Sequence, residues 1–266
     1  NFPAVKARYF RVRLHDWTDA ASKFCKLEIG DVWLSGRDMI DNWEVKTGLR
    51  SEVTYPHATG NNRGALKADD IIDITSLVDD EGHIDINGLR HIKEGKYRMI
   101  RIGHIHTGGH TKHGRSRVVW NGKELYAKTW LEADVMNAKA AELHYNSYFK
   151  AIYDTLCVIG CPPQGMHMDS HEAGIANWTP EMPTHFKRVA GYDIRPWLVA
   201  LCGYIIDNRE RTEQFLHDFR QTISATISDQ FYGTFARLCK RDSVTFTCQA
   251  MLGCVNDIIA SRGHAD

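Results

Sequence analysis

Two acids that could do chemistry lie three residues apart in the segment GMHMDSHEAGIANWT, residues 165–179. Asp169 ends a short apolar run that is typical of a strand, and Glu172 follows in the loop after it. Catalytic groups of α/β barrels gather where strands end, and a carboxylic acid there can protonate a leaving oxygen if its pKa is raised. The same spacing is also common among solvated loop acids. The spacing alone therefore leaves both interpretations open.

A second pair of acids lies in the segment KTWLEADVM, residues 128–136. The two-residue period of a strand predicts that Glu132 and Asp134 share one face with Trp130. Two acids on a buried face are unfavourable unless they are paired, hydrogen-bonded or bound to a metal. Either this face lines a polar pocket, or it lies at a wet edge where arginines and backbone donors satisfy the acids.

Four histidines occur in the segment GHIHTGGHTKHG, residues 103–114. His104 and His106 would share a strand face, whereas His110 and His113 lie in a glycine-rich stretch without a nearby Cys or acid. A transition-metal site or a contact to a ligand would use these side chains. The composition favours a third interpretation, a polar loop that joins two domains.

The seven cysteines show no zinc signature, because no two of them are spaced as CxxC. Most lie in segments that are predicted to be helices or strands, where a free cysteine packs as a small apolar residue. Buried thiols are therefore the favoured interpretation. One or two disulfides, or a metal cluster, are the alternatives.

The composition indicates a globular chain with a hydrophobic core and no net charge. The 266 residues are 43% hydrophobic, and 33 Lys plus Arg balance 33 Asp plus Glu. No basic run with interleaved aromatics appears, so nucleic acid is not an expected partner. No apolar run approaches the roughly 18 residues that span a membrane, and the first residues, NFPAVKARYF, lack the pattern of a signal peptide.

Two parts with different patterns are predicted. Residues 1–118 contain several short runs that alternate apolar and polar residues, which predicts a β-rich, sandwich-like module. These runs are RYFRVRL, KLEIGDVWLSG, the two halves of IIDITSLVDDEGHIDI, and YRMIRIGHIHT. Residues 119–266 predict the order β-α-β-α-α-α-β, with strands at 165–169 and 243–250. That order is typical of a parallel sheet with right-handed crossovers.

Capping residues and periodicity locate the helices of the second part. Asn137 is expected to cap a helix that ends near Gly160, and Thr179 to cap one that begins at Pro180. Asn208 is expected to cap a long helix with an apolar stripe at steps of four residues. The stripe consists of Phe215, Phe219, Ile223, Ile227, Phe231 and Phe235.

The length of the second part limits its architecture. Residues 119–266 are fewer than the roughly 200 that a complete (β/α)₈ barrel needs. The alternatives are a smaller open α/β sheet and an incomplete (β/α)₈ TIM barrel. The ending SRGHAD, without a closing element, favours the incomplete barrel as the expectation.

The order of motifs along the chain resembles that of the α-L-rhamnosidases of glycoside hydrolase family 106 and their relatives. The likeness covers nearly the whole chain, and its most specific part is DSHE, NWT and GYDIRPWL in that spacing. The motifs are, in order, RYFRVRL, DNWEVKTG, DITSLVDDEGHI, YRMIRIGHIHTGG, WLEADVMNAKAAELHY, MDSHEAGIANWT, GYDIRPWLVALCG and EQFLHDFR.

The resemblance implies a large bacterial enzyme, usually exported, that combines a (β/α)₈ barrel with β-sandwich modules. Such an enzyme removes terminal α-L-rhamnose from plant polysaccharides or glycosides with inversion, so a rhamnose-containing carbohydrate is the implied partner. Known members are associated with calcium. No calcium ligands are evident in this sequence, and the oligomeric state stays open.

An inverting glycosidase needs one carboxylic acid to protonate the leaving oxygen and one carboxylate to activate water, roughly 6.5–9.5 Å apart. Glu172 matches the glutamate of the family's Asp-Ser-x-Glu segment and is the predicted general acid. Asp169 is expected to orient it or to bind a sugar hydroxyl. In the family the second carboxylate follows the equivalent of ASRGHAD, and no Glu occurs here after Glu213. It is therefore expected to lie beyond Asp266.

Several residues are candidates for contact with the substrate. His171 stands where the family more usually has an aromatic residue, which leaves the substrate preference open. The alternatives to an enzyme are a non-catalytic carbohydrate-binding protein and an inactive gene fragment. The substrate-binding candidates are Trp178, as a platform for a sugar ring, together with Glu132, Asp134, His104 and Asn177.

Overall fold

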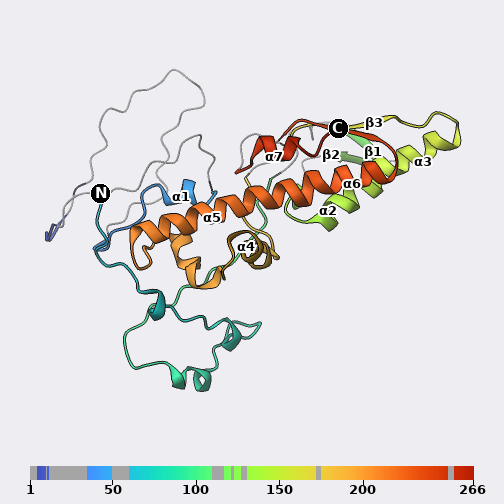
Figure 1. The fold of residues 1–266 in the computed structure, drawn as a ribbon. Helices are drawn as coiled ribbons and strands as arrows, with labels where there is room; N and C mark the ends of the chain where they lie inside the picture. Colours follow the sequence, from blue (N-terminus) through green and yellow to red (C-terminus); the bar gives the residue numbers. More distant parts are fainter. Residues whose placement is uncertain are drawn as a thin grey trace.

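A computed structural model gives the fold of the chain (Figure 1). Helices dominate the part that it describes, and the strands there form two two-stranded sheets. The described residues thus form a mixed α and β fold with fewer strands than the sequence predicts for them. None of the described helices is both long and apolar enough to cross a membrane. The described residues are 5–9, 11, 35–49, 60–109, 117–120, 123–126, 131–171, 175–250 and 255–266.

One long helix runs across the molecule in Figure 1. It consists of α5 (Arg209–Ile227), the π-helical turn η7 (Ser228–Tyr232) and α6 (Gly233–Arg241). Asn208 caps it as predicted, because its side-chain oxygen accepts a 2.8 Å hydrogen bond from a backbone N–H of the first turn. Every member of the predicted apolar stripe is buried, and Phe231, at 8% exposure, is the least so.

A parallel pair of strands lies against this stripe. The pair consists of β3 (Gly165–Met168) and β4 (Thr245–Cys248), with Met166 opposite Phe246. Both side chains are buried, and the ring of Phe246 stacks on that of Phe235 in α6 at 6.5 Å. The two predicted strands and their parallel pairing are confirmed.

The helix that Asn137 is predicted to cap precedes β3. It consists of α2 (Ala138–His144), the π-helical turn η5 (Tyr145–Phe149) and α3 (Lys150–Val158). The side chain of Asn137 caps it, accepting a 2.9 Å hydrogen bond from the backbone of its first turn. It ends before Gly160, whose φ of 77° is the left-handed conformation that glycine adopts readily. Both predicted ends are confirmed.

Helix α4 (Met182–Ala190) differs from its prediction at the first residue. Thr179 does not cap it: the helix begins at Met182 instead of Pro180, and Glu181 is the residue before it. The hydroxyl of Thr179 donates a 2.7 Å hydrogen bond to a carboxylate oxygen of Asp134. The helix ends at Gly191 in the left-handed conformation. The remaining described elements after residue 131 are η6 (Arg195–Cys202), which is a 3₁₀ helix, and α7 (Ile258–Arg262).

The strands predicted before residue 110 are not found where the structure describes that part. The segment YRMIRIGHIHT forms no strand, and the two halves of IIDITSLVDDEGHIDI are joined by a single bridge, between Val78 and Ile84. Ile105 is 92% exposed, so the alternating pattern there has no core to pack against. The segments RYFRVRL and KLEIGDVWLSG lie mostly outside the described residues. The elements found are α1 (Trp43–Lys46), η1 (Ala68–Asp70), η2 (Thr75–Leu77) and η3 (Ile86–His91), followed by the hairpin strands β1 (Arg117–Trp120) and β2 (Lys123–Tyr126).

Buried cations attach the segment around α1 to α5. Arg209, 6% exposed, donates from its guanidinium to the carbonyl oxygen of Met39 at 3.0 Å. Lys46, 1% exposed, lies 2.6 Å from a carboxylate oxygen of Glu213. Removing one partner of such a buried pair leaves an uncompensated charge. These contacts therefore fix the N-terminal segment on the long helix.

The buried face of α5 gives a direct test of the fold. Leu216→Ala should lower the free energy of unfolding by about 2–5 kcal/mol, because this fully buried side chain leaves a cavity. Leu143→Ala is the matched control: it also lies in a helix, but it is 68% exposed, so the loss should stay within about 0.5 kcal/mol. Urea denaturation of the two variants measures the difference. Equal losses would contradict the fold.

Candidate active site

Glu132 is a buried carboxylate where three distant segments meet. Its side chain is 6% exposed, and its Oε2 lies 3.5 Å from Nε2 of His171. The hydroxyl of Thr107 donates a hydrogen bond to its Oε1, and its backbone N–H donates to the carbonyl oxygen of Gly109 at 3.0 Å. The segment after residue 131, the loop after β3 and the glycine-rich stretch are thereby joined at one acid.

The ring of His171 is held between a charge and an aromatic ring. Phe231, a member of the long-helix stripe, meets it edge to face with ring centroids 5.9 Å apart. Burial lowers the pKa of His171 below its ordinary value, and the negative charge of Glu132 opposes this effect. The imidazole is therefore neutral at pH 7, and it can donate one N–H to the carboxylate.

Asp134 is satisfied by different donors. One oxygen accepts a 2.9 Å hydrogen bond from the backbone N–H of Met136, and the other accepts the hydroxyl of Thr179 at 2.7 Å. Thr179 is 1% exposed, so this contact joins two segments inside the protein. One of the open interpretations, that backbone donors satisfy the acids, therefore applies to Asp134.

The predicted strand through these two acids is wrong over its described part. Residues 132–134 have no strand geometry, and a turn follows at Val135 and Met136. A backbone hydrogen bond from Asn137 to Asp134, at 3.1 Å, closes this turn and stops any strand. Glu132 and Asp134 still face the segment from 169 to 179. Trp130 lies outside the described residues.

Of the two acids in the motif that begins at Asp169, the structure describes Asp169, at the end of β3 where the sequence places it. Asp169 follows the strand directly; its side chain is exposed and accepts a 2.9 Å hydrogen bond from the backbone N–H of Ser170. Glu172 lies outside the described residues. Its neighbour His171 is described, so the structure places the chain up to the residue before the predicted acid.

Two of the other candidates take part in packing. The ring of Trp178 is half-buried and lies 6.3 Å from that of Phe219, on the long-helix stripe. The side-chain amide of Asn177 donates a 2.9 Å hydrogen bond to the carbonyl oxygen of Thr47. These contacts attach the segment after the predicted acid to α5 and to the N-terminal segment.

The glycine-rich stretch reaches the site through a residue that the sequence did not single out. His104 is exposed, and the side chain that contacts Glu132 is that of Thr107. His110 and His113 lie outside the described residues. A threonine in a polar loop has no sequence pattern that predicts such a contact. The sequence also contains no pattern that predicts the pairing of His171 with an acid in a distant segment.

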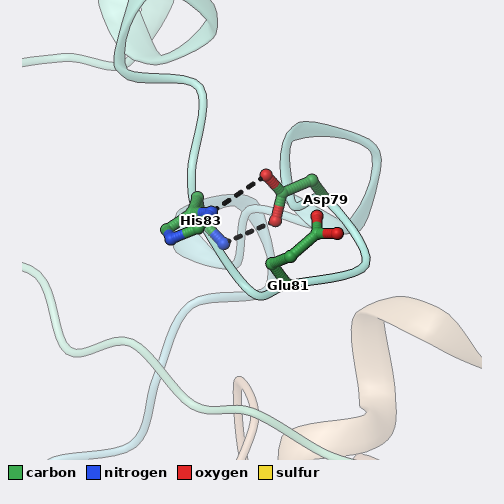
Figure 2. A group of neighbouring side chains, drawn as sticks. All are labelled: Asp79, Glu81 and His83. Atoms are coloured by element: carbon green, nitrogen blue, oxygen red, sulfur yellow. Dashed lines mark hydrogen bonds and ion pairs between the residues drawn. The ribbon is translucent and has the colours of Figure 1, made fainter.

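The cysteines and the calcium expectation give no site in the described part. The five described cysteines are free thiols, and Cys25 and Cys254 lie outside it. Figure 2 shows Asp79, Glu81 and His83 on one turn, the group whose ligand atoms are close enough together to hold a metal ion. All three are exposed, and the ring of His83 already pairs with Asp79 at 3.2 Å. Calcium takes six to eight oxygen ligands, so this group does not fit it.

Comparisons with known proteins find one family and two similar proteins. A family model described as alpha-L-rhamnosidase, Glyco_hydro_106, matches residues 9–266. A protein of Formosa agariphila that carries the name "Putative beta-glucuronidase" is 28% identical over 193 residues, which are 72% of this chain and 15% of that protein. The structure of a rhamnosidase from Novosphingobium sp. PP1Y aligns with a TM-score of 0.64 and 24% identity, over 85% of this chain and 21% of the other.

The structural comparison establishes a shared fold over most of this chain. The chain nevertheless spans only 15% of the matched protein of Formosa agariphila and 21% of the rhamnosidase chain. The activities of the full-length relatives are therefore only proposals for this chain.

The lowered pKa of His171 predicts how stability changes with pH. The folded chain binds the proton of His171 more weakly than the unfolded chain does. The contribution of His171 to the free energy of unfolding is therefore complete above about pH 6.5 and is lost as the pH falls below that value. His171→Phe keeps a ring against Phe231 but removes the titration. The free energy of unfolding of the unmodified protein should therefore fall relative to that of the variant between about pH 7.5 and pH 5.5. Denaturant titrations at each pH measure this, and a constant difference would disprove the assignment.

Proposed function

Because the chain belongs to glycoside hydrolase family 106, the α-L-rhamnosidase family, we propose that it forms part of the site where a terminal α-L-rhamnose is cleaved from a carbohydrate. One observation carries the proposal. The buried contact between Glu132 and His171 lies at the carboxyl end of β3, directly before the predicted acid in the chain. Strand ends of this kind hold the catalytic groups of barrel glycosidases.

The proposed reaction is hydrolysis with inversion. Glu172 donates a proton to the leaving oxygen, and Asp169, exposed at the strand end, binds a sugar hydroxyl or orients that acid. A second carboxylate activates water, and its location beyond Asp266 stays a prediction. The parallel pair β3 and β4, with the long helix packed against it, supports a (β/α)₈ barrel as the scaffold. The sandwich-like module, the calcium ion and export from the cell stay predictions of the family resemblance.

A second candidate reaction follows from the name of the relative in Formosa agariphila. Cleavage of a β-glucuronide would use the same kind of acid at the leaving oxygen, but it must also bind a carboxylate on the sugar. Assaying aryl α-L-rhamnosides beside aryl β-glucuronides with the intact protein separates the two reactions. Binding of either sugar without release of reducing sugar would instead support a non-catalytic carbohydrate-binding protein.

The proposed acid is tested by removing its proton and varying the leaving group. In the intact protein, Glu172→Gln should lower kcat for alkyl rhamnosides by about 10²–10⁴-fold, because a poor leaving group needs protonation. A dinitrophenyl rhamnoside leaves without a proton, so its hydrolysis should change little.

The matched control is Glu94→Gln, which changes an exposed acid that pairs with no other residue in the described part of the chain. It should leave both rates unchanged. Normal turnover of alkyl rhamnosides by Glu172→Gln would remove this residue from the mechanism.

A further inference from the structure

We propose that Glu132 is a positioning residue: through the ring of His171 it holds in place the stretch of chain that leads into the catalytic acid. The proposal rests on the proposed function, because His171 directly precedes Glu172 in the sequence. Adjacent Cα atoms are only about 3.8 Å apart, so the residue that fixes position 171 also fixes where the next residue starts.

The burial of Glu132 shows that it acts inside the protein. Its side chain is 6% exposed, and its Oε2 is shielded from solvent. An atom without access to solvent does not reach a sugar in the site unless the structure opens. Asp169, by contrast, is exposed. The two acids thus have separate roles, and Glu132 supports the site from behind.

The two oxygens of Glu132 have different partners. Oε1 accepts the hydroxyl of Thr107, whereas among the described residues Oε2 accepts no hydrogen bond of standard geometry and faces Nε2 of His171 at 3.5 Å. A buried carboxylate is stable only if donors compensate it. This requirement draws the N–H of the imidazole toward Oε2 and selects the tautomer that carries a proton on Nε2.

The ring of His171 makes an aromatic contact and a polar contact, whereas a ring without nitrogen would make only the aromatic one. Its ring packs edge to face against Phe231, and its nitrogen faces the carboxylate of Glu132. The ring is therefore held on an apolar side and on a charged side, which restricts its rotamers. A phenylalanine at 171 would keep the first contact and lose the second.

Thr107 extends this support to the glycine-rich stretch. Its hydroxyl accepts a 3.0 Å hydrogen bond from the backbone N–H of Gly109 while it donates to Glu132. The backbone N–H of Glu132 in turn donates to the carbonyl oxygen of Gly109. The stretch therefore has a supporting role in the site that its histidines do not explain.

The first test uses Glu132→Gln in the intact protein. The kcat for an alkyl rhamnoside should fall at least about 10-fold, because a misplaced acid protonates poorly. The KM should stay within about twofold, and the rate on a dinitrophenyl rhamnoside within about threefold, since that substrate needs no acid. Histidine NMR should show a lower pKa for His171, because the charge that opposes the effect of burial is gone.

A double-variant cycle shows whether Glu132 acts through His171. If it does, Glu132→Gln combined with His171→Phe should be no slower on the alkyl rhamnoside than His171→Phe alone. Losses that multiply would show that the two residues act independently, and would overturn the proposal. Glu142→Gln, which changes an exposed acid on α2, is the control and should leave all rates unchanged.

Thr107→Val keeps the test decisive if Glu132→Gln does not fold. Thr107 is exposed, and valine keeps its shape while removing the hydroxyl that holds Glu132. The ratio of the alkyl to the dinitrophenyl rate should fall about threefold. An unchanged ratio would overturn the proposal while the proposed function stands.

Absence of rhamnoside turnover by the unmodified intact protein would instead overturn the proposed function. The histidine NMR measurement then decides the contact alone. An unchanged pKa of His171 in Glu132→Gln would show that the two side chains are not coupled.

Discussion

The burial of one apolar stripe is the constraint on which the described structure depends. Its members repeat every four residues, whereas an α-helix has 3.6 residues per turn, so the stripe should drift by roughly 40° at each step. The π-helical turn at Ser228–Tyr232 is wider and offsets part of this drift. Ile227, Phe231 and Phe235 therefore all stay buried, although the helix continues for several turns.

The candidate site inherits its geometry from this stripe. β3 lies against the long helix, so the direction of the strand fixes where Asp169 emerges. Phe231 packs against the ring of His171, which follows the end of β3. A side chain of the core thus also forms one wall of the site. Any change that rotates the helix at the π-helical turn would move the core and this wall together.

Local signals explain which parts of the fold the sequence predicts. Asn137 and Asn208 cap their helices because the donors that they satisfy lie within the next turn. Thr179 does not cap α4, which begins at Met182, and its hydroxyl instead binds a partner 45 residues away, Asp134. The alternating segment around Ile105 fails as a strand because no core covers it. A pattern in one segment does not contain either of these facts.

The same distinction applies to the site. Residue types predict some of its features, whereas others depend on which segments the fold brings together. A buried acid must be compensated, so the sequence correctly suggests that Glu132 is paired or hydrogen-bonded. It does not reveal the partners, because Thr107 and His171 come from segments that meet only in the folded chain. An apolar residue at 132 would tolerate burial better. It would, however, remove the acceptor that orients the imidazole, and the chain before Glu172 would lose its polar attachment.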